Sequence, residues 1–106
     1  MRVLLDEQLP IDLAPVLQGH QVDSVVHRGW AGLKNGPLLR RMGGEYDVLI
    51  TMDRNLEFQQ NIAALPFGVL LVRAASNRMA HLAPLVPSML EVLPTVQPGQ
   101  ILRIGP

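Results

Sequence analysis

The chain has 106 residues, which is enough for one domain with its own core and too short for two. It is 48% hydrophobic and 17% charged, which predicts a packed globular domain and excludes a disordered tail, and without cysteines it has neither a disulfide framework nor a thiol nucleophile. Nine basic and nine acidic residues give a formal net charge of zero, which argues against a strongly basic protein that binds duplex nucleic acid.

The first residues of the chain bear on its location. Acidic side chains at Asp6 and Glu7 come too early for a secretory signal peptide. No uncharged apolar run reaches the roughly 18 residues that a membrane span needs. We therefore expect a cytoplasmic protein with no membrane association.

The first half of the chain alternates short apolar runs with stretches that favour helix. The expected elements are a strand over 2–5, a helix over 9–18, a strand over 21–27 and a helix over 35–42. Pro15 is expected to kink or shorten the first helix, and Gly19 to end it. Asn35 is the expected N-cap of the second helix.

The second half continues the alternation. The expected elements are a strand over 47–52, a helix over about 54–63, a strand over 67–73, a helical stretch over 77–93 and a strand over 100–104. The run over 47–52 is continuously apolar, as in a buried parallel strand. Pro84 and Pro87 argue against one continuous helix over 77–93. The alternation predicts a single three-layer α/β domain with a mainly parallel five-stranded sheet, and we expect the strand order 2-1-3-4-5.

Two aspartates follow strands of this predicted sheet. In open α/β sheets, ligands bind beyond the carboxyl ends of the strands, where the strand order reverses. With the order 2-1-3-4-5 that place lies between the first and third strands, which Asp6 and Asp53 follow. Two neighbouring carboxylates either share a proton or bind a cation, and oxygen ligands favour Mg²⁺ or Mn²⁺. The alternative is that each aspartate only caps the helix after it.

Two motifs resemble those of a known family. The sequence LLDEQLP at 4–10, followed by LITMDRNL at 49–56, is similar to the short PIN-like domain family. The resemblance covers nearly the whole chain and implies a ribonuclease that cleaves single-stranded RNA with Mg²⁺ or Mn²⁺, of the kind that serves as the toxin of a toxin–antitoxin pair. It places Asp6 and Asp53 at the catalytic, metal-binding positions, with Glu7 and Asn55 as secondary ligands. It also implies a small antitoxin as a partner and is compatible with a homodimer.

The chain departs from that family at several positions. Asn35 stands where relatives usually have an acidic residue, Asn55 replaces an aspartate, and Gln8 replaces an asparagine. An amide oxygen can bind a metal but brings no charge, so these changes are expected to weaken Mg²⁺ binding. A catalytically degenerate PIN-like module, which binds RNA or a protein without cutting, is therefore the alternative function.

Four basic residues are candidate RNA contacts. Arg28, Lys34, Arg40 and Arg54 fall in loops and helix starts near the expected site, where a guanidinium can donate two hydrogen bonds to a phosphate. Arg54 directly follows Asp53 and is the strongest of the four, while an ordinary solvated surface is the alternative for the others. Trp30 is a further candidate, either as a platform for a base or as a buried anchor of its loop.

A third hypothesis is a phosphoacceptor receiver domain. That class resembles this chain in having acidic residues after the first and third strands. It also needs a lysine at the end of the fifth strand, whereas the lysine here is Lys34, in the loop after the second. The missing lysine makes this hypothesis the weakest of the three.

Overall fold

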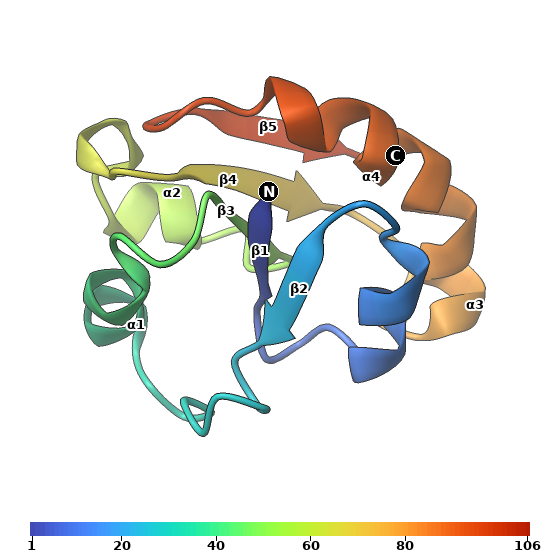
Figure 1. Cartoon of the computed structure of the whole chain (residues 1–106), viewed down its shortest axis with the longest axis horizontal. Coiled ribbons are helices and arrows are strands. Elements are labelled where there is room, and N and C mark those ends of the chain that lie inside the picture. The colour runs from blue at the N-terminus through green and yellow to red at the C-terminus, as the bar shows by residue number, and fades with distance from the viewer.

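The computed structural model describes all residues, 1–106, and contains one five-stranded sheet between two layers of helices (Figure 1). The strands are β1 (Arg2–Leu5), β2 (Gln21–Ser24), β3 (Val48–Thr51), β4 (Gly68–Val72) and β5 (Ile101–Ile104). All neighbouring strands pair in parallel, and their order is β2-β1-β3-β4-β5. The predicted fold class and strand order are thus confirmed.

The helices are short. The α-helices are α1 (Asn35–Met42), α2 (Leu56–Gln59), α3 (Met79–Leu82) and α4 (Val86–Val92), and 3-10 helices cover Ile11–Val16, Ile62–Ala64, Ala83–Leu85 and Leu93–Thr95. None of these helices combines the length and the hydropathy that crossing a membrane requires.

Prolines and a turn account for the main differences from the predicted elements. The helix predicted over 9–18 is a six-residue 3-10 helix with Pro15 inside it, because proline has no N–H to donate to the α-helical ladder. The stretch over 77–93 is likewise divided, with Pro84 and Pro87 each in the first turn of a new segment. β2 ends at Ser24 and not at residue 27, because the Ser24 carbonyl and hydroxyl accept hydrogen bonds from the N–H groups of Arg28 and His27 in a tight turn.

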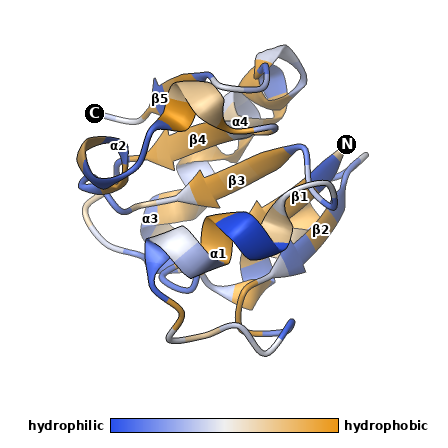
Figure 2. Cartoon of the chain, turned by 90° about the vertical axis from the view of Figure 1, so that its left-hand side faces the viewer, coloured by the Kyte–Doolittle hydropathy of each residue, from blue (hydrophilic) through white to orange (hydrophobic).

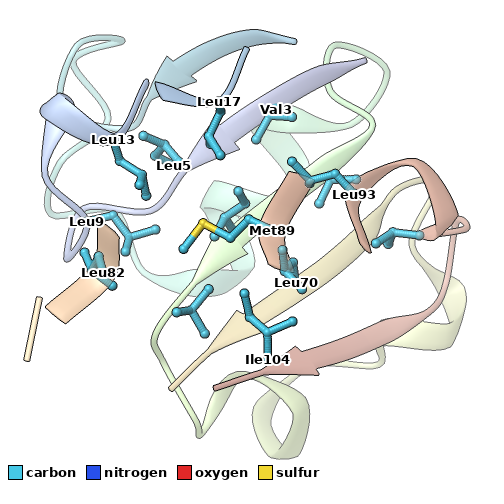
Figure 3. Packing of buried hydrophobic residues seen from close by; sticks show 14 residues of the cluster. Val3, Leu5, Leu9, Leu13, Leu17, Leu70, Leu82, Met89, Leu93 and Ile104 are labelled. Carbon is cyan, nitrogen blue, oxygen red and sulfur yellow. The ribbon is translucent and has the colours of Figure 1, made fainter. Parts of the chain in front are cut away.

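Alternate residues of the strands face opposite layers of the domain. Val3 and Leu5 point into a cluster that contains Leu13 and Met89, between the sheet and the layer of α3 and α4 (Figure 3). Leu4 belongs to a second cluster, on the side of α1 and α2. Figure 2 shows β3 and β4 as hydrophobic ribbons, whereas β2 at the edge of the sheet carries polar residues. Burial on both faces fixes the register, because a slip by one residue would exchange the two sets of side chains.

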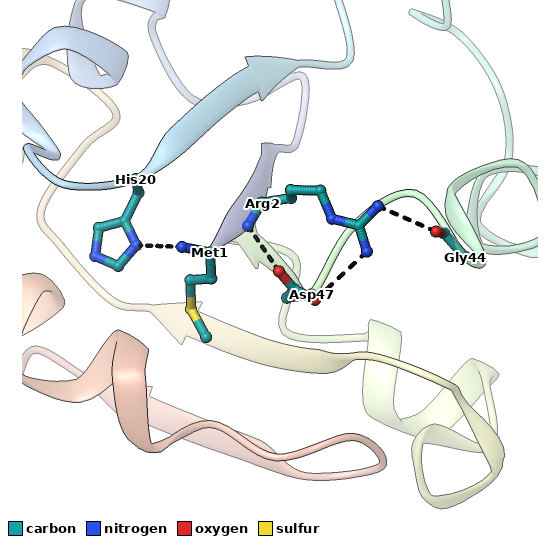
Figure 4. A network of polar contacts seen from close by, with 5 residues as sticks. All are labelled: Met1, Arg2, His20, Gly44 and Asp47. Carbon is teal, nitrogen blue, oxygen red and sulfur yellow. Dashed lines mark hydrogen bonds and ion pairs between the residues drawn. The ribbon is translucent and has the colours of Figure 1, made fainter.

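A polar network ties down the amino ends of the strands (Figure 4). The Arg2 N–H donates to Asp47 Oδ2 at 2.7 Å, and its guanidinium pairs with Asp47 and donates to the Gly44 carbonyl. Met1 N lies 3.4 Å from Nδ1 of His20. Burial lowers the pKa of His20, and the neighbouring ammonium group lowers it further. These charges lie at the end of the sheet opposite to the two aspartates, so they take no part in the site.

Candidate metal and nucleic-acid site

Asp6 and Asp53 lie at the carboxyl end of the sheet, the end where the chain leaves β1, β3, β4 and β5. Leu5 and Ile50 are paired across β1 and β3, and the Asp6 N–H extends this pairing by donating to the Ile50 carbonyl at 2.9 Å. Asp53 lies two residues after the end of β3. The sheet therefore brings the two aspartates out on neighbouring strands, at the point where the strand order reverses.

The hydroxyl of Thr51 connects the two aspartates. It donates a hydrogen bond to Asp6 Oδ2 at 2.7 Å and accepts one from the Asp53 N–H at 3.0 Å. Thr51 is fully buried, so its hydroxyl cannot exchange these partners for water. One side chain at the end of β3 therefore orients the Asp6 carboxylate and the backbone of Asp53 together.

Asp6 is the one charged residue among the buried residues of the chain, with 4% of its surface exposed. Its Oδ1 accepts the Glu7 N–H at 2.9 Å, and its Oδ2 accepts the Thr51 hydroxyl. None of the three ion pairs in the structure includes it. Burying a carboxylate lowers the stability of the fold unless a cation offsets its charge, and the protein supplies no cation to Asp6.

Asp53 is held by neutral donors. Its Oδ1 accepts the Asn55 N–H at 2.9 Å, and its Oδ2 accepts the side-chain amide of Asn35 at 3.1 Å. The same Asn35 nitrogen donates to Oε1 of Gln59. The prediction that Asn35 caps α1 is therefore wrong, because Lys34 is the N-cap and makes no side-chain hydrogen bond there. The Asn35 amide instead joins α1 to Asp53 and α2.

The residues after Asp6 form a turn, closed by a bond from the Leu9 N–H to the Asp6 carbonyl. Glu7 is exposed and its Oε2 accepts the Gly32 N–H at 3.2 Å, so it contacts the loop before α1 and not Asp53. Gln8 Oε1 is buried without a hydrogen-bond partner, and no other buried side-chain nitrogen or oxygen lacks one. An unpartnered acceptor therefore lies in the same turn as the buried carboxylate.

Two carboxylates are a small donor set, of the kind with which a protein commonly holds a Mg²⁺ ion that keeps most of its water. No group of three or more histidine, cysteine, aspartate and glutamate side chains is close enough to hold a metal by itself. Magnesium in proteins is commonly held by only one or two carboxylates, together with waters and the phosphates of a substrate. Asp6 and Asp53 supply two carboxylates, each oxygen with a further lone pair.

The predicted basic residues lie in different places. Arg54 is exposed and lines a pocket of about 350 Å³ together with Arg73, directly beside Asp53. Arg40 lies in a second pocket, of about 290 Å³, with Gly36 and Gln60. Lys34 is exposed at the start of α1, next to Asn35. Arg54 and Lys34 thus adjoin residues of the site, whereas Arg40 lies farther along α1.

Arg28 has structural partners. Its guanidinium pairs with Glu45, donates to the Tyr46 hydroxyl and lies 4.2 Å from the centre of the Trp30 ring. The Tyr46 hydroxyl donates in turn to Asp23, and the pKa of Tyr46 is raised by burial and by this bond. Bonds to Glu45 and Tyr46 raise the pKa of Arg28. Trp30 is 9% exposed, so it anchors the loop and offers no open face to a base.

Sequence reasoning missed three residues at this end of the sheet. The link through Thr51 depends on a tertiary contact between strands that are 45 residues apart in the sequence. Arg73 directly follows the buried strand β4, much as Asp53 follows β3. This position after a strand is the sequence signal that could have identified Arg73. Phe58 is 81% exposed on α2, which no periodicity over a four-residue helix could reveal. In Figure 2, α2 lies on the side to which the arrowhead of β3 points.

We expect Thr51→Val to destabilise the fold by about 2 kcal/mol. The substitution keeps the side-chain shape but leaves Asp6 Oδ2 without a donor and the Asp53 N–H without an acceptor. Urea denaturation measures the change. Thr95→Val is the matched control, because the Thr95 hydroxyl bonds the Val92 carbonyl at an exposed position, and its loss is expected to cost under about 0.5 kcal/mol. Equal effects of the two substitutions would contradict a special role for Thr51.

Comparison with known proteins assigns no family to the chain. No protein-family model, curated protein or solved structure matches the chain.

Proposed function

We propose that the protein is a Mg²⁺- or Mn²⁺-dependent ribonuclease of PIN-like type that cleaves single-stranded RNA at the carboxyl end of its sheet. The observation that carries the proposal is Asp6, a buried carboxylate without a cationic partner, joined through Thr51 to a second aspartate on the neighbouring strand. A fold that buries a charge without offsetting it sacrifices stability, and such sites are characteristic of function.

Each residue has a distinct task in this proposal. Asp6 and Asp53 hold the ion, and Asn55 and the exposed Glu7 serve as secondary ligands or position water. Thr51 orients the Asp6 carboxylate and the backbone of Asp53. A bound Mg²⁺ or Mn²⁺ offsets the charge of the scissile phosphate and lowers the pKa of the attacking water. The chain supplies the geometry of attack by holding both carboxylates on rigid strand ends.

RNA is the preferred substrate because of what surrounds the two aspartates. Arg54 adjoins Asp53 without an ion-pair partner, and Lys34 adjoins Asn35, so both can contact the RNA backbone, with Arg40 as a more distant contact. Arg28 is left out of this role because Glu45 and Tyr46 hold its guanidinium. Phe58 presents an exposed ring on α2, and single-stranded nucleic acids bind by stacking bases on such rings. With the family resemblance, the proposal extends to a toxin that a small antitoxin inactivates by covering this end of the sheet.

The test is cleavage of a fluorescently labelled single-stranded RNA by purified protein. Cleavage is expected with Mn²⁺ or Mg²⁺ and not with EDTA, and calorimetry is expected to show that Mn²⁺ binds more tightly when a non-cleavable RNA is present, because phosphates complete a site with two carboxylates. Cleavage that persists in EDTA, or no cleavage of any single strand in either metal, would contradict the proposal.

One observation favours a second candidate, the catalytically degenerate module that binds RNA or a protein. The Asn35 amide donates to Asp53 Oδ2, so a neutral protein donor already satisfies an oxygen that the metal would need. An acidic side chain at position 35 would instead repel Asp53 and draw a cation. For this candidate, binding of RNA or of a protein partner is unaffected by Mn²⁺ and EDTA.

We expect Asn35→Asp to raise Mn²⁺ affinity by about tenfold, because a third carboxylate adds ligand charge beside Asp53. The same change is expected to destabilise the metal-free protein slightly, because it replaces a hydrogen bond with repulsion. Calorimetry and thermal denaturation measure the two effects. Asn61→Asp is the control, since Asn61 is exposed and lies outside the site, and it should leave Mn²⁺ affinity unchanged. Unchanged affinity in Asn35→Asp would mean that Asp53 does not hold the ion.

A further inference from the structure

The pocket beside Asp53 has two arginines and no acidic residue. It lies where the chain leaves β3 and β4, and Arg54 and Arg73 line it together with Met52, Val72, Ala74, Ala75 and the last residue, Pro106. Neither arginine is in an ion pair, whereas Arg2, Arg28 and Arg103 each have a carboxylate partner. Two guanidinium groups that share one pocket repel each other unless an anion lies between them.

The backbone that carries Arg73 is firmly placed. The Arg73 N–H donates to the Ile104 carbonyl at 2.9 Å, which joins the end of β4 to the end of β5. Gly105, with φ +94°, packs directly on the Arg73 carbonyl, and a Cβ at that position would collide with it. The chain can approach so closely only because residue 105 is glycine. The Arg73 side chain therefore starts from a fixed point while its guanidinium remains free for a ligand.

Size and lining identify the class of ligand. A volume of about 350 Å³ is at the small end of ligand sites, which run from roughly 300 to 1,000 Å³. Two guanidinium groups suit a phosphate, since each can donate two hydrogen bonds to it. The apolar side chains suit a less polar part attached to that phosphate. A nucleotide has both parts, whereas inorganic phosphate would leave the apolar wall unused.

The strand order sets the position of the pocket relative to the two aspartates. Asp6 follows β1 and Asp53 follows β3, whereas the pocket lies at the ends of β3 and β4. Along the edge of the sheet, Asp53 therefore comes between Asp6 and the pocket. Neighbouring strands are about 4.8 Å apart, which makes the pocket an immediate neighbour of the aspartates. We infer that this pocket binds the nucleotide next to the scissile phosphodiester, with Arg54 and Arg73 on its phosphate; the inference rests on the proposed function.

Calorimetric titration in EDTA tests the pocket without the metal site. Adenosine 5′-monophosphate, adenosine and inorganic phosphate are the probes, and wild type, Arg54→Gln, Arg73→Gln and Arg41→Gln are the proteins. Arg41 is an exposed, unpaired arginine in the last turn of α1, outside the pocket, and serves as the control. The monophosphate is expected to bind wild type and Arg41→Gln equally, and to bind Arg54→Gln and Arg73→Gln about tenfold more weakly.

The other probes separate a nucleotide site from simpler ones. Adenosine that binds as tightly as its monophosphate, inorganic phosphate that binds as tightly as the nucleotide, or monophosphate binding that ignores both pocket substitutions would each overturn the inference. So would the absence of monophosphate binding to wild type. Monophosphate binding through Arg73 in a protein that cleaves no RNA would contradict the proposed ribonuclease function while supporting the nucleotide pocket, so the two failures are distinguishable.

Discussion

Asp53→Asn is expected to lower the rate of Mn²⁺-dependent RNA cleavage at least 100-fold, and to abolish Mn²⁺ binding, while the fold remains intact. Loss of a group that merely supports a metal ligand typically costs about 10- to 100-fold, so loss of a ligand itself should cost at least the upper figure. The fold should persist because an asparagine Oδ1 can still accept the Asn55 N–H that Asp53 now accepts. Single-turnover cleavage, calorimetry and thermal denaturation measure the three quantities.

Asp12→Asn is the matched control for this experiment. Asp12 is exposed in the 3-10 helix Ile11–Val16 and has no ion-pair partner, so the substitution removes the same charge at a position outside the site. Its cleavage rate is expected to stay within about twofold of wild type. Wild-type cleavage by Asp53→Asn would remove this residue from the mechanism, and equal losses in both variants would show that net charge alone is responsible.

Asp6→Asn is expected to abolish cleavage to a similar extent and yet to leave the metal-free protein as stable as wild type, or more stable. The Asp6 carboxylate is buried without a cation, so its charge costs stability that the neutral amide regains. Asparagine can still accept the Glu7 N–H through Oδ1 and can donate to the Thr51 hydroxyl. Urea denaturation in EDTA measures the stability.

Added Mn²⁺ supplies the second part of the same experiment. Saturating metal should raise the melting temperature of wild type, because an ion that binds only the folded state stabilises it by about 2.7 kcal/mol at 100 times its dissociation constant. The melting temperature of Asp6→Asn should not respond. A loss of several kcal/mol in EDTA would instead mean that Asp6 is a structural carboxylate, and a metal response equal to wild type would show that it does not bind the ion.

Asp47→Asn is the comparison for a carboxylate that has a cationic partner. Asp47 pairs with the Arg2 guanidinium and accepts the Arg2 N–H at a partly exposed position. Its replacement is expected to destabilise the protein by up to about 1 kcal/mol, with and without metal, and to leave cleavage unchanged. In EDTA, a gain in stability for Asp6→Asn and a loss for Asp47→Asn would distinguish a functional from a structural aspartate within one fold.

Strand positions could be predicted from the residues because local patterns decide them. The apolar runs at 2–5, 47–52 and 67–73 are too continuous for an exposed strand, and β1, β3 and β4 lie within them. Helix lengths could not be predicted as well, because helices of four to eight residues carry little periodicity and Pro15, Pro84 and Pro87 divide them. Local sequence predicts Asn35 as a helix cap, but its amide bonds Asp53 and Gln59, which come 18 and 24 residues later.

Local sequence was enough to establish the α/β class and to place Asp6 and Asp53 after strands, since strand ends depend on hydrophobic runs that any short window contains. Only the tertiary structure decided what surrounds the two carboxylates. Burial of Asp6, its link through Thr51 and the shared pocket of Arg54 and Arg73 all depend on side chains far apart in the sequence that the parallel sheet brings to one end. A charge's partners are set by contact in space, and nothing in the spacing of residues along the chain encodes them.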